Sequence, residues 1–209
     1  KRYNHKNIIV IANPFPEFNK NKSLNRENII INVGRFGDQK NQHLLLKYFN
    51  EIDTEGWELI FIGDGNKRKL FDKEFKILKE GKKVKVLHSV ENLESYYKKA
   101  AIFAFTSTSE GFPNSLGEAM GYGCACISFD CEAGPSELIE DNFNGFLIEN
   151  FDHYSFKIKL RNLMESENLR SDFSCKSKLK MEEFHEDVIG LKFLNFILPT
   201  TDFIINQKK

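Results

Sequence analysis

The sequence is poor in cysteine, proline and tryptophan, and it carries no excess of charge of either sign. Its 209 residues include four cysteines, five prolines and one tryptophan, and 30 Lys and Arg side chains balance 30 Asp and Glu. A net charge of zero argues against a nucleic-acid module, whose usual footprint is a basic surface. We therefore expect no nucleic acid among the partners, and any basic site must be local.

The cysteines predict neither a metal centre nor a disulfide framework. They are Cys124, Cys126, Cys131 and Cys175, with no C-x-x-C pair and no histidine at zinc spacing. Three of them crowd into residues 123–131, a segment typical of a buried strand in which free cysteine acts as a small hydrophobic residue. This usage indicates a reducing compartment.

Long apolar runs are also absent. No run approaches the roughly 18–20 residues that span a bilayer, and the first residues lack the apolar core of a signal peptide. The chain is therefore expected in the cytoplasm, either free or attached peripherally to the inner face of the cell membrane.

Short apolar runs alternate with longer amphipathic segments, which predicts βα units around a parallel sheet. Six strands are predicted, at Ile29–Val33, Glu58–Ile62, Val84–Leu87, Ala101–Phe105, Ala125–Phe129 and Gly145–Ile148. Helices are predicted between them, at Gln42–Glu51, Lys67–Glu80, Leu93–Lys99, Ser115–Tyr122 and Ser136–Glu140. The predicted fold class is α/β, a doubly wound parallel sheet.

Three parts are expected along the chain. Residues 1–28 form a short strand, Ile8–Ala12, followed by an extended connector, and residues 29–150 form the α/β domain. Residues 151–209 hold closing helices and a polar tail. These helices are predicted at Tyr154–Ser166, Asn168–Glu183 and His185–Ile197.

Ligands of a doubly wound sheet bind beyond the carboxyl ends of its strands, so the chemistry is sought in the loops there. The first such loop holds Gly34, Arg35 and Lys40. Glycine allows close backbone approach and the cations neutralise charge, so the loop suits a phosphate. The alternative is a solvated turn whose basic side chains point to water.

Weaker signals follow the second and third strands. The segment Gly63-Asp64-Gly65 is compatible with generic turn chemistry. A lone histidine such as His88, before Ser89 and Val90, is more often a surface or capping residue than a catalyst.

The loop after the fourth strand is the most informative. Glu110 lies in the loop, and Glu118 follows eight residues later in the next helix. Four residues around that helix start leave backbone N–H groups accessible for a phosphate: Gly111, Asn114, Ser115 and Gly117. Ser115-x-x-Glu118 is alternatively a capping box, in which the carboxylate accepts the Ser115 N–H. The fifth loop, 130–137, is either an ordinary turn or a wall of a ligand pocket.

Four motifs run in order along the chain: GR…KN (34–41), GDG (63–65), SEGFPNSLGEA (109–119) and GPSELI…NGFL (134–147). Together they resemble the C-terminal, donor-binding domain of the retaining glycosyltransferases of family 4, and the E-x7-E element is the most specific of them. The resemblance implies the GT-B fold, in which two Rossmann-like domains face each other across a cleft. It also implies that this chain is the second of these domains and that the acceptor-binding N-terminal domain is missing from it.

The resemblance also implies a role for each candidate residue. Catalytic roles fall to Arg35 and Lys40, which would neutralise the donor diphosphate, and to Glu110, which would contact the transferred sugar. The remaining candidates would bind the donor through the backbone or side chain: Gly34, Asp64, Val90, Asn114, Ser115, Leu116 and Glu118. Within this set Glu118 would hold the ribose hydroxyls, and Val90 would lie near the base, where Ser89 replaces the usual glycine.

The implied activity is transfer of a hexosyl or N-acetylhexosaminyl group from a UDP-sugar to a glycan or lipid-linked acceptor in cell-surface polysaccharide biosynthesis. No cofactor or metal is expected, since a D-x-D motif is absent. Retention leaves two mechanisms open, a carboxylate nucleophile such as Glu110 or a same-face reaction guided by the leaving phosphate. A GT-B epimerase or synthase, or a degenerate nucleotide-binding module, is the alternative function.

Two expectations follow for the chain by itself. It should bind a nucleoside diphosphate but turn over little, because half of the cleft is absent. An apolar face near Val188–Ile197 should also be left uncovered, because the family's last helix crosses back to the other domain.

Overall fold

The computed structural model describes residues 8–18, 25–65 and 68–198. Six parallel strands form one sheet in the order β3-β2-β1-β4-β5-β6. The strands are β1 Glu27–Val33, β2 Glu58–Ile62, β3 Lys83–Leu87, β4 Ala100–Phe105, β5 Ala125–Asp130 and β6 Phe146–Glu149. The chain winds outward from β1 to β3 and then outward on the other side from β4 to β6. The winding therefore reverses between β1 and β4, as in a doubly wound fold, which confirms the predicted fold class.

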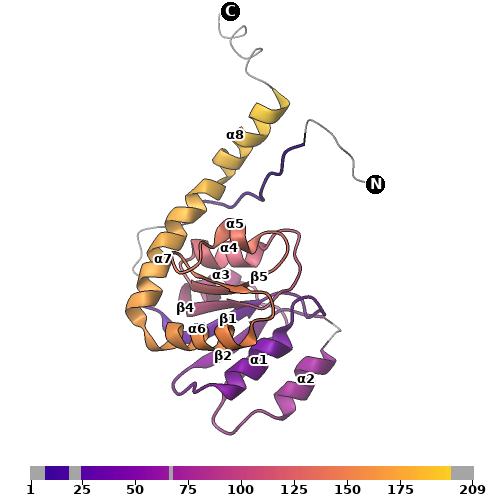
Figure 1. The fold of residues 1–209 in the computed structure, drawn as a ribbon, viewed down its shortest axis with the longest axis vertical. Coiled ribbons are helices and arrows are strands. Elements are labelled where there is room, and N and C mark those ends of the chain that lie inside the picture. The colour runs from indigo at the N-terminus through magenta and orange to yellow at the C-terminus, as the bar shows by residue number, and fades with distance from the viewer. Residues whose placement is uncertain (1–7, 19–24, 66–67, 199–209) are drawn as a thin grey trace, which may run out of the picture.

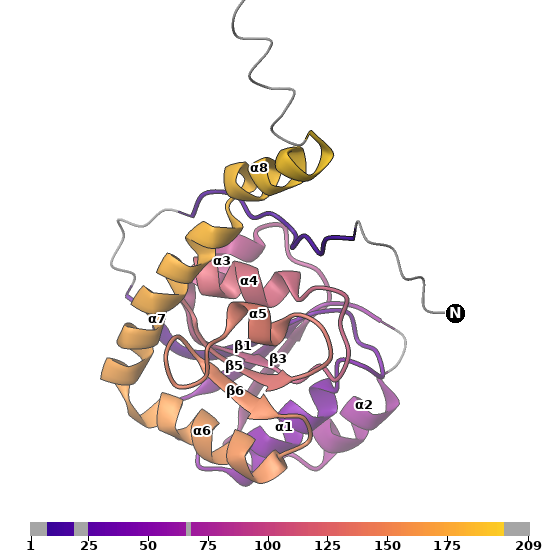
Figure 2. The same ribbon diagram turned by 45° about the horizontal axis from the view of Figure 1, so that its top comes forward.

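Helices cover both faces of the sheet (Figures 1 and 2). They are α1 Gln42–Glu51, α2 Lys69–Lys76, α3 Leu93–Lys99, α4 Asn114–Gly121, α5 Pro135–Leu138, α6 His153–Glu165, α7 Glu167–Met181, the 3-10 helix η1 Glu182–Phe184 and α8 Glu186–Ile197. Successive strand residues point to opposite faces, so Ile30 joins the core beneath α1 and α6 whereas Ile31 joins the core beneath α3 and α4. Two cores result, one on each face.

All six predicted strands are confirmed to within one or two residues at each end. The predicted helix at Lys67–Glu80 is shorter in the structure and ends at Lys76; Lys67 itself lies outside the described residues. Asn50 explains this early end, because its side chain accepts from Lys79 N at 2.8 Å and donates to Ile77 O at 3.2 Å. These bonds replace the ones that a continued helix would make.

The predicted strand at Ile8–Ala12 is wrong. Residues 8–14 have no regular structure, and Ile8 and Val10 are exposed at 65% and 83%. A strand needs a neighbour to share its backbone hydrogen bonds, and within the described residues none lies beside this segment. Its first bridge is at Phe15, which pairs with His185 at the start of α8.

The connector after this segment is docked on the domain instead. Phe15 N donates to Phe184 O at 2.8 Å, and Glu186 N donates to Phe15 O at 3.0 Å. The Phe15 ring lies so close to α4 that a Cβ added at Gly117 would meet it at 2.2 Å, and a Cβ at Gly121 would meet the Phe18 ring at the same distance. The two rings therefore pack against the two glycines, which lie four residues apart on one face of α4.

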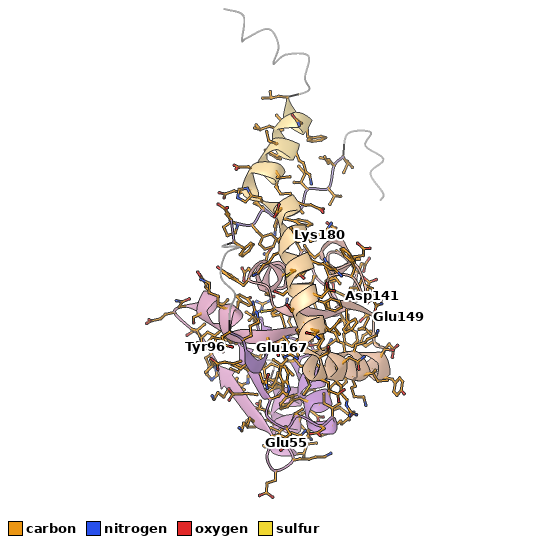
Figure 3. All side chains as sticks on the ribbon, turned by 90° about the vertical axis from the view of Figure 1, so that its left-hand side faces the viewer. Glu55, Tyr96, Asp141, Glu149, Glu167 and Lys180 are labelled. Carbon is orange, nitrogen blue, oxygen red and sulfur yellow. The ribbon has the colours of Figure 1, made fainter. Side chains whose placement is uncertain are left out.

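Helix α8 extends away from the rest of the molecule (Figures 1 and 3). Ile189 is buried at 5% exposure, but six other apolar side chains of α8 are between 37% and 60% exposed: Val188, Leu191, Phe193, Leu194, Phe196 and Ile197. The uncovered apolar face expected near Val188–Ile197 is thus confirmed. Within the described part of the chain, no helix combines the length and apolar character needed to cross a membrane.

Candidate functional site

The loops that follow β1 and β2 pack backbone against backbone. Gly34 N donates to Ile62 O at 3.0 Å, and Phe36 N donates to Asp64 O at 2.9 Å. Gly63 has φ +151° and a Cβ there would lie 2.1 Å from Gly34 O, which excludes any side chain. The segment 63–65, which by itself was compatible with generic turn chemistry, is therefore a close-packing motif that fixes the first loop.

The loops that follow β1 and β4 are also joined, across the point where the winding reverses. Thr108 N donates to Gln39 O at 2.9 Å, and the Thr106 hydroxyl donates to Lys40 O at 2.9 Å. Asn41 Nδ2 donates to the Thr108 hydroxyl at 3.2 Å. Asn41 adopts φ +48°, a left-handed conformation that asparagine tolerates, directly before α1. These bonds join the two loops at the point of the sheet edge where doubly wound folds bind their ligands.

An ion pair also joins these two loops. Lys40 Nζ lies 2.5 Å from Glu110 Oε1, and the two side chains are 27% and 10% exposed. The Lys40 stem passes over Gly34, where an added Cβ would lie 3.8 Å from its Cδ and Cε. The Lys40 ammonium also lies 5.4 Å from the centre of the Phe105 ring. Arg35 is exposed on the same loop, and its side chain has no hydrogen bond or ion pair within the described residues.

Helix α4 begins at Asn114, with Pro113 at the N-cap position. Asn114 N donates to Phe112 O and Leu116 N donates to Pro113 O, both at 3.0 Å, whereas no such bond is found for Ser115 N within the described residues. The Leu116 side chain is fully buried, so only its backbone faces this end of the helix. The open N–H at a helix start suits an anion.

The capping box at Ser115-x-x-Glu118 is not formed. Ser115 is the second residue of α4 rather than its cap, and the cap position makes no side-chain hydrogen bond. Glu118 Oε2 instead accepts from the hydroxyl of Tyr97 on α3 at 2.9 Å. Burial raises the pKa of the Glu118 carboxyl, and the bond from Tyr97 lowers it in part. Glu118 thus has a half-buried carboxylate that does no capping.

A groove of about 550 Å³ opens between α3, α4 and the docked connector. Both Asn114 and Glu118 line it, and Asn13 Nδ2 donates to Asn114 Oδ1 at 2.9 Å. Aromatic side chains form much of its wall: Phe15, Phe18, Tyr97 and Tyr122. A groove with apolar rings and a carboxylate is suited to a ligand that combines a flat ring with hydroxyl groups.

The remaining two candidates lie on the loops after β2 and β3. Asp64 is exposed, its carboxylate accepts from Gly65 N at 2.7 Å, and Oδ1 lies 3.6 Å from His88 Nδ1. Val90 is half-buried and packs against the core beneath α3 and α4. These two loops are therefore neighbours at the same edge of the sheet.

The ten candidate residues all lie at the carboxyl edge of the sheet or on α4. The structure brings Lys40 and Glu110 into contact and places Asn114 and Glu118 in one groove. Sequence reasoning missed Tyr97 and Asn13, which bond to Glu118 and Asn114. A tyrosine on the apolar face of a helix was the available signal for Tyr97, since a buried hydroxyl needs a partner.

Comparisons with known proteins agree with this architecture. Residues 15–180 match the sequence profile of the family "Glycosyl transferases group 1". The chain is 31% identical over 201 residues to the amylovoran biosynthesis glycosyltransferase AmsD of Erwinia amylovora, covering 92% of this chain and 56% of that protein. It is 29% identical over 198 residues to a Campylobacter jejuni α-1,4-N-acetyl-D-galactosaminyltransferase that acts on a diphospho-undecaprenol-linked glycan, covering 92% of this chain and 55% of that protein.

Among solved structures, a mutant of Staphylococcus aureus TarM, crystallised with fondaparinux, α-GlcNAc-glycerol and UDP, superimposes with a TM-score of 0.85 at 25% identity. The match covers 94% of this chain and 40% of TarM. The chain spans about half the length of the curated relatives described above. Since the family profile covers most of the chain and the fold agrees, the chain belongs to the glycosyl transferases of group 1 and forms one half of the GT-B fold.

Proposed function

We propose that this chain is the donor-binding half of a retaining glycosyltransferase that takes a sugar from a UDP-sugar. The observation that carries the proposal is the meeting of Lys40 and Glu110 where the winding reverses, beside a groove that holds Glu118. Doubly wound sheets bind their ligands at that point. The cation, the two carboxylates and the groove are the parts that a charged, hydroxyl-rich donor requires.

The diphosphate is assigned to the cationic end of this site. Lys40 and Arg35 supply positive charge from the loop after β1, and Gly34 leaves room for the phosphate oxygens. The start of α4 supplies the backbone N–H of Ser115, for which no acceptor is found within the described residues. Charge develops on the diphosphate as the sugar leaves, so fixed cations and dipoles at this position stabilise the transition state.

The nucleoside and the sugar are assigned to the two glutamates. A carboxylate accepts several hydrogen bonds, and the position of Glu118 in the groove supports its assignment to the ribose hydroxyls. Glu110 at the sheet edge contacts the transferred sugar, and Val90 lies toward the base. Either retaining mechanism is compatible with Glu110 in this position.

The acceptor is assigned to a further domain outside this chain. The chain spans 56% and 55% of the two curated relatives, which supports this assignment. Transfer by the chain alone is accordingly expected to be weak. The name of the Campylobacter enzyme supports an N-acetylhexosaminyl donor and an undecaprenol-linked glycan as acceptor, and the name of AmsD supports a role in polysaccharide biosynthesis. A hexosyl donor and a reaction in the cytoplasm or at the inner face of the membrane are part of the same proposal.

Calorimetric titration of the chain with UDP, ADP and GDP in EDTA tests the proposal. We expect UDP to bind in preference to the other two, without a metal, and the variants Arg35→Ala and Glu118→Ala to weaken it at least tenfold. Arg161→Ala is the matched control, because Arg161 is exposed and paired with Glu165 on α6, away from the site. Absence of binding by any nucleotide, or equal binding by the variants, would contradict the proposal.

A further inference from the structure

Tyr97 is a buried tyrosine whose hydroxyl points at a residue of the donor site. Its side chain lies on α3 and is 1% exposed, and the hydroxyl donates to Glu118 Oε2 at 2.9 Å. The two residues come from the two helices that flank the groove. Nothing in the catalytic roles assigned above uses this phenol.

The position of Tyr97 is fixed from several sides. Arg26 Nη1 donates to Tyr97 O at 3.0 Å, and the same guanidinium donates to Ala100 O and Tyr122 O, which ties the end of α3 to the end of α4. The Tyr97 ring stacks on Tyr122 at 5.7 Å between centres, with 12° between the planes, and is tilted against Phe103 at 6.1 Å. The hydroxyl is therefore held at one point of the groove wall.

The groups around Glu118 offer its carboxylate few partners besides the Tyr97 hydroxyl. Among the described residues that line the groove beside it, the titratable groups are Glu94 and Tyr97 on α3 and Tyr122 directly after α4, and none of these three is a cation. The carboxyl of Glu94 is already bonded to Lys98. Within the described residues, Tyr97 is thus the group that satisfies Glu118, and no hydrogen bond is found to Glu118 Oε1.

We propose that Tyr97 is a positioning residue for the nucleoside. Its hydroxyl holds Glu118 Oε2 and leaves Oε1 available to accept a hydrogen bond from a ribose hydroxyl of the donor. The inference rests on the proposed function, since it assigns the ribose to Glu118. A carboxylate held at one oxygen has less rotational freedom to lose on binding, so the fixed phenol strengthens the contact that it does not itself make.

The test compares UDP with 2′,3′-dideoxy-UDP, which lacks the ribose hydroxyls, by calorimetry. Tyr97→Phe keeps the ring and removes the hydroxyl. We expect this variant to bind UDP roughly tenfold more weakly and to bind dideoxy-UDP with unchanged affinity. Tyr96→Phe is the matched control, since Tyr96 is the adjacent half-buried tyrosine on α3 (labelled in Figure 3), and it should change neither affinity. A general loosening of the helix pair would weaken both ligands alike.

The pH profile gives a second readout. The bond from Tyr97 lowers the pKa of Glu118, so its removal raises that pKa. Only the ionised carboxylate accepts at both oxygens, so UDP affinity in Tyr97→Phe should fall at a higher pH on acidification than in the parent. If Tyr97→Phe does not fold, a fluorine on the Tyr97 ring beside the hydroxyl provides a second variant. The fluorine makes the hydroxyl a stronger hydrogen-bond donor, so UDP affinity should fall at a lower pH than in the parent.

The outcomes separate this inference from the proposed function. Three results would overturn the positioning role. They are an equal loss of affinity for UDP and dideoxy-UDP in Tyr97→Phe, an unchanged affinity for UDP, and a pH profile that does not move. If the parent does not bind UDP, or if Glu118→Gln binds it as tightly as the parent, the assignment of the donor site itself fails.

Discussion

Lys40 Nζ lies 2.5 Å from Glu110 Oε1, and this contact joins the loops after β1 and β4 where the winding of the sheet reverses. In the proposed site the ammonium serves the donor diphosphate and the carboxylate serves the sugar. The phosphate oxygens therefore compete with Glu110 for the same cation, and donor binding exchanges one partner of Lys40 for another. This exchange leads to two opposite predictions for the two residues.

Lys40→Ala should weaken the binding of UDP at least tenfold, because a charge-assisted contact to the diphosphate is lost. The matched control is Lys157→Ala. Lys157 is 31% exposed and pairs with Glu51 at 2.7 Å, so it resembles Lys40 in exposure and pairing but lies on α6. Titration calorimetry on both variants checks the prediction, and an equal effect of the two substitutions would contradict it.

Glu110→Gln should have the reverse effect on UDP. Removal of the carboxylate frees Lys40 from its partner, and a partly exposed pair of this kind is worth under about 1 kcal/mol, so UDP should bind roughly threefold more tightly. Transfer to an acceptor should fall, because the contact with the sugar is lost. Weaker UDP binding by Glu110→Gln would show that the pair is part of the phosphate site rather than its competitor.

Gly63→Ala should destabilise the fold by about 3 kcal/mol, since Gly63 has φ +151° and the new Cβ would meet Gly34 O at 2.1 Å. Gly111→Ala is the control, because a Cβ at Gly111 meets no atom within 4 Å. Urea unfolding of the two variants measures the difference. Similar midpoints for both would mean that the two loops are not packed as described.

The docked connector gives a prediction that uses two variants. Phe15 is 4% exposed, so Phe15→Ala should cost about 3–5 kcal/mol, whereas Val10→Ala, at 83% exposure, should have no measurable effect. Gly117→Ala should destabilise the parent, because its Cβ meets the Phe15 ring at 2.2 Å.

In the Phe15→Ala background the same Gly117→Ala change should instead stabilise the protein by up to about 1 kcal/mol, since alanine is the better helix former. A Gly117→Ala effect of the same sign and size in both backgrounds would exclude the contact between the ring and the glycine. Chemical unfolding of the four proteins in this cycle provides the measurement.

The environment of His43 leads to a prediction about how the stability of the fold depends on pH. Burial lowers the pKa of this half-buried imidazole below its ordinary value of about 6.5, with Lys47 lowering it further and Glu74 opposing the shift. The unfolded chain therefore binds more protons, and the contribution of His43 to stability is full above pH 6.5 and is lost as the pH falls through that value. His43→Gln should lose less stability than the parent between pH 7 and pH 5, and an equal loss would contradict the shift.

Much of the fold could be predicted because the residue pattern within each segment indicates whether it forms a strand or a helix. Central strands such as Ala100–Phe105 are buried on both faces and read as continuous apolar runs. The same rule failed at Ile8–Ala12, because an apolar run becomes a strand only where a neighbouring strand can pair with it. Local pattern carries no information about that neighbour.

The candidate site was predictable as a set of loops but not as a set of contacts. Motif spacing placed Glu118 on α4, yet it also allowed a capping box that the structure does not form. The partners of Glu118 and Asn114 are Tyr97 and Asn13, which lie 21 and 101 positions away along the chain. Contacts at such separations depend on the packing of whole elements, so no local pattern could predict them.

The most direct test of the donor site is a crystal structure of the chain with UDP. The structure should place the diphosphate between Lys40, Arg35 and the start of α4, and the ribose hydroxyls on Glu118 with Tyr97 still bonded to Oε2. Density for UDP elsewhere, for example in the hollow of about 480 Å³ between Phe36, His43 and Leu70, would contradict the assignment of this part of the sheet edge as the donor site.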